Sequence, residues 1–235
     1  MIRMLTVIPN GDPEEVAGLA GELPQIREYV ESAELYRSLA KDCHALCLLV
    51  KDENCLSDLL ASIASLPLLK RSWENNPTDI YLRQCFELAD GRWRTKEGCE
   101  PATSEVIAWP NSSAVRIIIH GAYEDNPRME ELTIAEIHET RREPGCIQYS
   151  WMENIELSNH LMLIELWANQ RIYDVHWAER LRTVEYRGDS GRSAIKPSRG
   201  ESSREFYRAQ SFDFRYGRFV PYDVAQMSES VVWGA

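Results

Sequence analysis

The clearest hydrophobic pattern lies in the second half of the chain. Short apolar, β-branched runs predict buried strands there, and two stretches with apolar residues at near-helical spacing predict helices between them. A Pro-Gly pair ends the first of these helices, and a polar turn joins the second and third strands. The predicted strands are residues 114–123, 147–152, 160–167 and a run within 204–214, and the predicted helices are residues 129–142 and 168–186.

The first half repeats this order of elements. Acidic residues after Asp12 and Pro13 favour a helix start, because carboxylates complement the positive end of a helix dipole. Residues 45–62 can be set against residues 161–178 without a gap, although few positions are identical. The predicted strands are residues 2–8, 33–40, 44–51 and 80–88, and the second predicted helix is residues 56–73.

Each half therefore reads β-α-β-β-α-β, which is the ferredoxin-like order. One face of such a sheet is covered by helices, and the other is apolar and has to be buried, for example against a second sheet. We expect an α+β fold in which two ferredoxin-like units form a pseudo-dimeric α/β barrel within one chain. The expected domains are residues 1–90 and 113–220, with a polar linker over 91–112 and a tail over 221–235.

The composition argues against several classes of protein, including nucleic-acid-binding and membrane-spanning proteins. The 235 residues carry a formal charge of −11, which argues against a nucleic-acid partner because a phosphate backbone requires a basic face. The longest apolar run, residues 45–50, is far shorter than the roughly 20 residues of a membrane span. The six cysteines form no CxxC pair, which favours free thiols and no metal site. We expect a soluble, cytoplasmic protein without a membrane partner.

Three short motifs in the second half carry a family resemblance. They are EPGC at residues 143–146, LIELW at residues 163–167 and YDVH at residues 173–176. Their order and spacing resemble the antibiotic biosynthesis monooxygenase family of the dimeric α/β-barrel superfamily. The first half resembles it only weakly, since Lys51 stands at the position of Trp167 and Leu60 at that of His176. The resemblance implies a degenerate first domain and one active site, in the second domain.

Within this family the chain is similar to anthrone oxygenases and to the ring-opening oxygenases of angucycline pathways. This similarity implies catalytic roles for four residues of the second half, although Leu163 replaces an Asn found in anthrone oxygenases. His176 is suited to be a general base, since histidine titrates near neutrality. The implied catalytic residues are His176, Trp167, Tyr173 and Arg187, and the implied substrate-binding residues are Tyr149, Trp151, Leu163, Glu165 and Trp177.

The implied function is oxygenation of an aromatic, polyketide-type phenol or hydroquinone in natural-product biosynthesis. The resemblance implies O2 as cosubstrate, no metal and no bound cofactor, with reduced flavin as an alternative cosubstrate, and a homodimer as an option. A haem-degrading monooxygenase is a second enzymatic interpretation. A non-oxidative polyketide cyclase or ligand-binding protein on the same fold is a third, because one fold hosts many functions. Each candidate residue also has a purely structural interpretation as core or helix-end packing.

Overall fold

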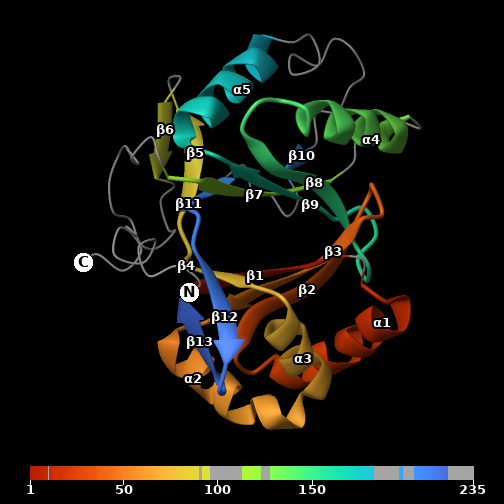
Figure 1. Ribbon diagram of the computed structural model, residues 1–235, viewed down its shortest axis with the longest axis vertical. Coiled ribbons are helices and arrows are strands. Elements are labelled where there is room, and N and C mark those ends of the chain that lie inside the picture. The colour runs from red at the N-terminus through yellow and green to blue at the C-terminus, as the bar shows by residue number, and fades with distance from the viewer. Residues whose placement is uncertain are drawn as a thin grey trace. The chain divides into compact units, whose positions relative to one another are not determined.

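The computed structural model describes residues 1–9, 11–89, 92–95, 113–122, 128–182, 196–197 and 204–221. The chain divides into two compact units (Figure 1). Unit 1 comprises the described residues of 1–37, 41–83 and 210–235, and unit 2 comprises those of 38–40 and 84–209. Each unit is an antiparallel sheet with helices, so the predicted α+β fold class with two ferredoxin-like units is confirmed.

Unit 1 is built on six strands in the order β13-β12-β4-β1-β3-β2. The four strands β4-β1-β3-β2 have the ferredoxin-like order, and the helices of this unit lie along one face of the sheet (Figure 1). The strands are β1 Ile2–Pro9, β2 Val30–Ser38, β3 Cys43–Val50, β4 Thr78–Leu82, β12 Ser211–Arg215 and β13 Arg218–Pro221, and the helices are α1 Pro13–Glu22, α2 Glu53–Ser62 and α3 Pro67–Asn75, with short 3-10 turns at Leu23–Ile26 and Ile63–Ser65.

The core of unit 1 is apolar throughout. Alternate residues of β1 and β3, such as Met4 and Leu48, belong to one buried cluster with Leu59, Leu69 and Trp73 of the helices. Strand side chains alternate between the two faces of a sheet, so this period-two pattern directs one apolar set toward the helices. The Asp52 carboxylate accepts a hydrogen bond from Cys55 N at 2.8 Å and caps α2.

The single helix expected over residues 56–73 is wrong, because two helices occupy this stretch. α2 ends in a 3-10 turn, and α3 begins at Pro67. Proline has no N–H to donate and disfavours the α conformation for the residue before it, and Leu66 accordingly has φ −120° and ψ 70°. The apolar spacing continued through the break and hid it.

Unit 2 has the matching strand order β8-β9-β7-β11-β5-β6. Its ferredoxin-like strands are β8, β9, β7 and β11, and α4 and α5 cover one face of them (Figure 1). The strands are β5 Cys85–Ala89, β6 Arg92–Thr95, β7 Val115–Ala122, β8 Cys146–Asn154, β9 Leu161–Trp167, β10 Lys196–Pro197, which pairs with β7, and β11 Arg204–Arg208, and the helices are α4 Met129–Thr140 and α5 Gln170–Arg182.

A hairpin follows the fourth ferredoxin-like strand of each half and extends the sheet of the other unit. The strands expected over residues 80–88 and within 204–214 are therefore each two strands. β5, which follows β4 in sequence, pairs with β11 of unit 2, and β12, which follows β11, pairs with β4 of unit 1. Unit 1 thus contains a C-terminal segment that the expected domain boundaries place with the second domain.

A repeated sequence accompanies these two crossings. Residues 79–88 read DIYLRQCFEL and residues 205–214 read EFYRAQSFDF, a likeness that the offset aligning the first strands does not reveal. In unit 2 the Gln84 amide Nε2 donates to Phe206 O at 3.0 Å. In unit 1 the Gln210 amide Nε2 donates to Ile80 O at 2.5 Å. Both glutamines are buried, so each crossing is fixed by the same type of side chain.

The crossing glutamines give a stability prediction. Gln84→Ala and Gln210→Ala each remove a buried amide that binds a backbone carbonyl, and each is expected to lower the free energy of unfolding by about 1–3 kcal/mol. The exposed Gln25 provides the control, and Gln25→Ala is expected to stay within about 0.5 kcal/mol of the parent. Urea unfolding of the three variants measures the difference. Equal midpoints for all three would contradict this role.

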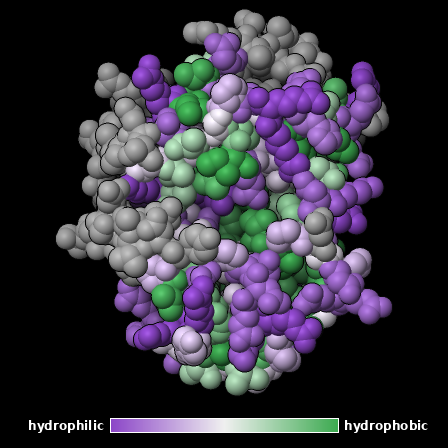
Figure 2. All heavy atoms as spheres, in the orientation of Figure 1, coloured by the Kyte–Doolittle hydropathy of each residue, from purple (hydrophilic) through white to green (hydrophobic). Residues whose placement is uncertain are grey.

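Hydrophilic side chains dominate the visible surface. On the face drawn in Figure 2, they cover most of the described residues, with separate apolar groups between them. No helix within the described ranges is long and apolar enough to cross a membrane. The five cysteines at described positions are all free thiols.

Candidate active site

The EPGC motif forms a tight turn that leads into β8. Cys146 N donates to Glu143 O at 3.1 Å, and Gly145 has φ +82°, which together with Pro144 is typical of a type II turn. Gly145 O accepts a hydrogen bond from Ala168 N at 2.9 Å, just before α5. The turn thereby ties the start of β8 to the start of α5.

Gly145 is required at this turn for two reasons. Its positive φ is unfavourable for an L side chain, and a Cβ would lie 2.6 Å from Ile172 Cδ1. Gly217 is a matched comparison, since it has φ +75° but no atom within 4 Å of the place that a Cβ would occupy. We expect Gly217→Ala to destabilise by about 1–2 kcal/mol through backbone strain alone, and Gly145→Ala to destabilise by more. Thermal unfolding tests this order, and equal losses would contradict the packing argument.

The turn places Glu143 against the one histidine of the YDVH motif. His176 lies on α5 and is 5% exposed, and its Nδ1 is 2.8 Å from Glu143 Oε2. An ionised carboxylate can only accept hydrogen bonds, so Nδ1 carries the proton in this contact. The carboxylate thus fixes the tautomer and orientation of the imidazole, and a proton transferred to this histidine would go to Nε2.

Aromatic rings surround His176. Its ring centroid lies 4.6 Å from that of Trp167 on β9, 6.0 Å from Tyr149 on β8 and 6.4 Å from Tyr173 on α5. All three aromatic side chains are almost fully buried. The structure therefore brings three of the sequence-predicted site residues to the fourth, His176, between the sheet and α5.

Glu165 and Trp167 lie on the same side of β9. The Trp167 indole Nε1 donates to Glu165 Oε2 at 2.8 Å, and Glu165 is 2% exposed. This carboxylate is thus held by a tryptophan N–H, a partner that was not predicted from the sequence. Trp167 therefore satisfies one acceptor of a buried carboxylate.

This bond gives a prediction for Trp167→Phe. Phenylalanine fills much of the same space but cannot donate to Glu165, so the buried acid loses a hydrogen bond. We expect the free energy of unfolding to fall by about 1–3 kcal/mol. Combining it with Glu165→Gln in a double-mutant cycle measures the coupling between the two side chains. A coupling energy of zero would contradict the importance of this bond.

A residue of β11 forms a hydrogen bond with the Tyr173 hydroxyl. Arg204 Nη1 donates to the Tyr173 hydroxyl at 2.9 Å, and the same guanidinium lies 3.7 Å above the ring of Trp177. The Tyr173 ring also packs edge-on against Phe206 at 5.5 Å. A cation thus lies beside two predicted site residues and can stabilise negative charge that develops there.

The remaining predicted substrate-binding residues belong to the same core. The Tyr149 hydroxyl donates to Glu136 Oε1 of α4 at 2.5 Å. Trp151 and Leu163 pack in the same buried cluster, and the Trp151 indole N–H has no hydrogen-bond partner in the part of the chain that is described. A buried donor of this kind is available to a polar group of a ligand.

Arg187, the fourth predicted catalytic residue, lies outside the described residues. Sequence reasoning did not assign roles to Glu143, Glu136 and Arg204. Glu143 was read as part of a turn motif, and its distance in sequence from His176 hides the contact. Arg204 was read as the end of a polar, basic loop.

Cys146 lies beside this cluster but is unsuited to be a nucleophile. Burial raises the pKa of its thiol to about 12, with further contributions from the negative charges of Glu165 and Glu143. The reactive form of cysteine is the thiolate, which is scarce at neutral pH under these conditions. The acid–base chemistry of the site is therefore centred on His176.

Comparison with known proteins agrees with this location. The family model described as Antibiotic biosynthesis monooxygenase matches residues 124–179, which span the turn, β8, β9 and most of α5. This segment is similar to the antibiotic biosynthesis monooxygenase family. The family resemblance expected from the three motifs is confirmed for this segment. No curated protein sequence matches the chain.

Several solved structures are similar to this chain. An anthrone oxidase-like protein is 11% identical over 88% of this chain and 90% of its own, with a TM-score of 0.31. A monooxygenase-like protein from Listeria innocua is 10% identical over 88% and 94%, with a TM-score of 0.31. A conserved protein from Methanosarcina mazei Go1 is 20% identical over 42% of this chain and 94% of its own, with a TM-score of 0.32. Similarities this distant carry no conclusion about function.

Proposed function

We propose that the chain is an oxygenase that acts on an electron-rich phenol or hydroquinone, with His176 as general base and Glu143 as its positioning residue. The observation that carries the proposal is the 2.8 Å contact between the buried His176 and Glu143, beneath a ring of aromatic side chains. A buried imidazole with a fixed tautomer is suited to remove a proton from a phenol near neutral pH.

The reaction follows from making the substrate anionic. His176 Nε2 takes the proton, and the resulting phenolate has carbanion character at a ring carbon. That carbon gives an electron to O2, and the radical pair combines to a peroxide. Loss of water from the peroxide leaves a carbonyl, so one oxygen atom of O2 enters the product and the other leaves as water. No external reductant is required for this balance.

The surrounding side chains support the same chemistry. Trp167, Tyr149 and Tyr173 are flat aromatic side chains buried around His176, and aromatic walls of this kind suit a polycyclic aromatic substrate. The Arg204 guanidinium, together with the unpartnered Trp151 N–H among the described residues, can stabilise the phenolate and the developing peroxide. These contacts support a phenolic substrate, and polyketide-type phenols are the class we propose.

The experiment is oxygen uptake by the metal-free protein with a panel of anthrones and polycyclic hydroquinones, with and without reduced flavin. Uptake without flavin is the expected result. Oxygen uptake that occurs only with flavin would mean that the enzyme requires reduced flavin as a cosubstrate. Absence of uptake in both arms, with a shift of the melting temperature by a panel compound, would replace the oxygenase by a cyclase or binding protein.

A further inference from the structure

Unit 1 contains a cavity of its own, lined by residues of α1, of α3 and its C-cap, and of the end of β1 and the segment after it. Its volume is about 330 Å³, which is within the range of small-molecule sites. The first domain was expected to keep none of the pocket chemistry of the second. This cavity is a separate feature, because none of its residues corresponds to His176 or Trp167.

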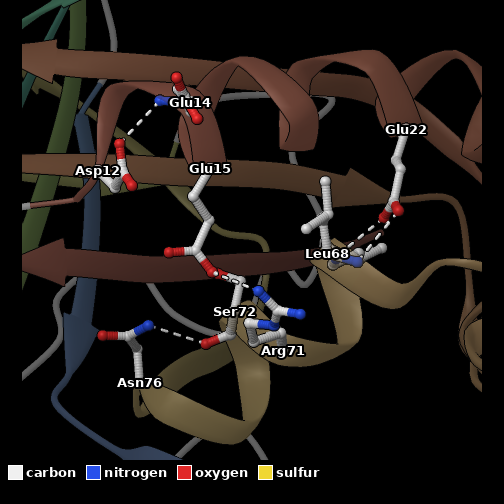
Figure 3. A network of polar contacts seen from close by, with 9 residues as sticks. Asp12, Glu14, Glu15, Glu22, Leu68, Arg71, Ser72 and Asn76 are labelled. Atoms are coloured by element: carbon white, nitrogen blue, oxygen red, sulfur yellow. Dashed lines mark hydrogen bonds and ion pairs between the residues drawn. The ribbon is translucent and has the colours of Figure 1, made fainter.

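The two helices that form the cavity walls are held at a fixed separation. The Glu22 carboxylate at the end of α1 accepts hydrogen bonds from Leu68 N at 3.0 Å and Leu69 N at 2.8 Å, at the start of α3 (Figure 3). Gly18 allows close approach, since a Cβ there would lie 2.5 Å from Leu68 Cδ1. The cavity is thus preformed, which lowers the entropy cost of binding.

Part of the cavity lining is apolar. Ile8, Val16, Leu19 and Leu68 line it, and Val16 and Leu19 are themselves buried in the core of unit 1. Such a surface suits the hydrocarbon part of a ligand, because transfer of that part from water is favourable.

A buried hydroxyl also belongs to the cavity lining. Ser72 on α3 is 7% exposed, and its Oγ has no hydrogen-bond partner among the residues that the structure describes. A buried polar atom without a partner is unfavourable, so a ligand that binds it gains a hydrogen bond at little desolvation cost. The Asn76 amide also lines the cavity: one N–H of its Nδ2 donates to Ser72 O at 2.9 Å, and its amide oxygen is a hydrogen-bond acceptor.

The charge around the cavity favours a cation. Asp12 and Glu15 line it, and Figure 3 shows the Glu15 side chain directed from α1 toward Arg71 and Ser72 of α3. The ion pair between Arg71 and Glu15 is long, at 3.8 Å, and the two side chains are 59% and 41% exposed. The last turn of α3 also lines the cavity and has no basic residue of its own to balance the negative end of its dipole.

We propose that this cavity binds a small amphiphilic amine. Its hydrocarbon body would pack on the apolar part of the lining, and its ammonium group would donate to the carboxylates of Asp12 and Glu15 and to the Ser72 hydroxyl. The site belongs to unit 1 alone and does not depend on the oxygenase function proposed for unit 2.

The test uses three probes of similar size on the full chain: 2-phenylethylamine, 2-phenylethanol and 3-phenylpropionate. Titration followed by two-dimensional amide NMR is expected to give saturable shifts for the amine, with a Kd of about 1 mM or tighter. The shifts should be confined to α1, α3 and the end of β1. The alcohol should bind more weakly and the carboxylate weakest. Unsaturable amine binding, or equal binding of the carboxylate, would overturn the proposal.

Variants locate the site. Ser72→Leu fills the cavity and should abolish amine binding, and Glu15→Gln should weaken it on the order of tenfold through loss of a charged acceptor. Glu53→Gln, at an exposed position of α2, is the matched charge control and should leave the Kd unchanged. A folded Ser72→Leu that binds the amine normally would overturn the proposal. If that variant fails to fold, the positions of the amide shifts in the parent protein still test the site: shifts outside α1, α3 and the end of β1 would overturn the proposal.

Discussion

His176→Ala is expected to lower kcat/KM for a phenolic substrate by about 10²–10⁴-fold, the usual contribution of a general base. The side chain is buried, is bound to Glu143 at 2.8 Å and packs on Trp167, so the variant removes the one imidazole of this cluster. Initial rates of oxygen uptake over a range of substrate concentrations measure the effect. Circular dichroism and thermal unfolding show whether the fold is retained.

The control for this variant is His138→Ala. His138 is an exposed histidine in the last turn of α4, so its removal changes the histidine content without touching the aromatic cluster. It should leave kcat/KM within about twofold of the parent. Turnover by His176→Ala at the parental rate would remove His176 from the mechanism.

Glu143→Gln is expected to lower kcat by about 10–100-fold, by analogy with the loss of a partner that orients a metal-ligating histidine. The glutamine amide oxygen can still accept from Nδ1, but the side chain carries no charge. Its amide N–H can also donate to an unprotonated Nδ1, so glutamine selects between the two histidine tautomers less strictly. A negative charge beside an imidazole favours the protonated ring, so its removal lets the ring lose its proton at lower pH. The acid limb of the pH–rate profile should therefore move to lower pH.

The direction of this shift separates positioning from simple structural support. A variant that only loosened the fold would lower the rate at every pH and leave the limb in place. Glu130→Gln, at an exposed position of the first turn of α4, is the matched control and should change neither rate nor profile. A shift of the limb to higher pH in Glu143→Gln would contradict the proposed contact.

The sequence was sufficient to predict most of the strands and helices that build the ferredoxin-like units. Apolar alternation located β7, β8 and β9, and near-helical spacing located α4 and α5, because one face of each element is buried in the same core. The same periodicity could not show a break at Pro67 within residues 56–73, since the apolar pattern continues across it. Periodicity describes which face is buried and is insensitive to where one helix ends and the next begins.

Pairing between distant segments was harder to predict. Nothing in residues 80–88 alone indicates that β4 and β5 belong to different units. The clue was the repeat of Tyr81, Gln84 and Phe86 at Tyr207, Gln210 and Phe212, in an alignment register different from the one that matches the first strands. A comparison made with one fixed offset cannot detect it, because the two halves differ in length between these segments.

The candidate site was predictable in its aromatic part and not in its polar contacts. Trp167, Tyr173 and His176 lie within short motifs, and the structure brings their rings together. The Glu143–His176 and Arg204–Tyr173 contacts join positions about thirty residues apart on different elements. Hydrogen bonds of this kind depend on how the turn at Gly145 and the strand β11 are placed, which residue spacing does not encode.

The most direct test of the account is product formation under isotopically labelled O2 by the metal-free, flavin-free protein and by His176→Ala. For the parent protein, one labelled oxygen atom should enter each product molecule, and the second should appear in water. His176→Ala should form labelled product at a rate lower by about 10²-fold or more. Product without label, or labelled product formed equally fast by the variant, would contradict an oxygenase built on the Glu143–His176 pair.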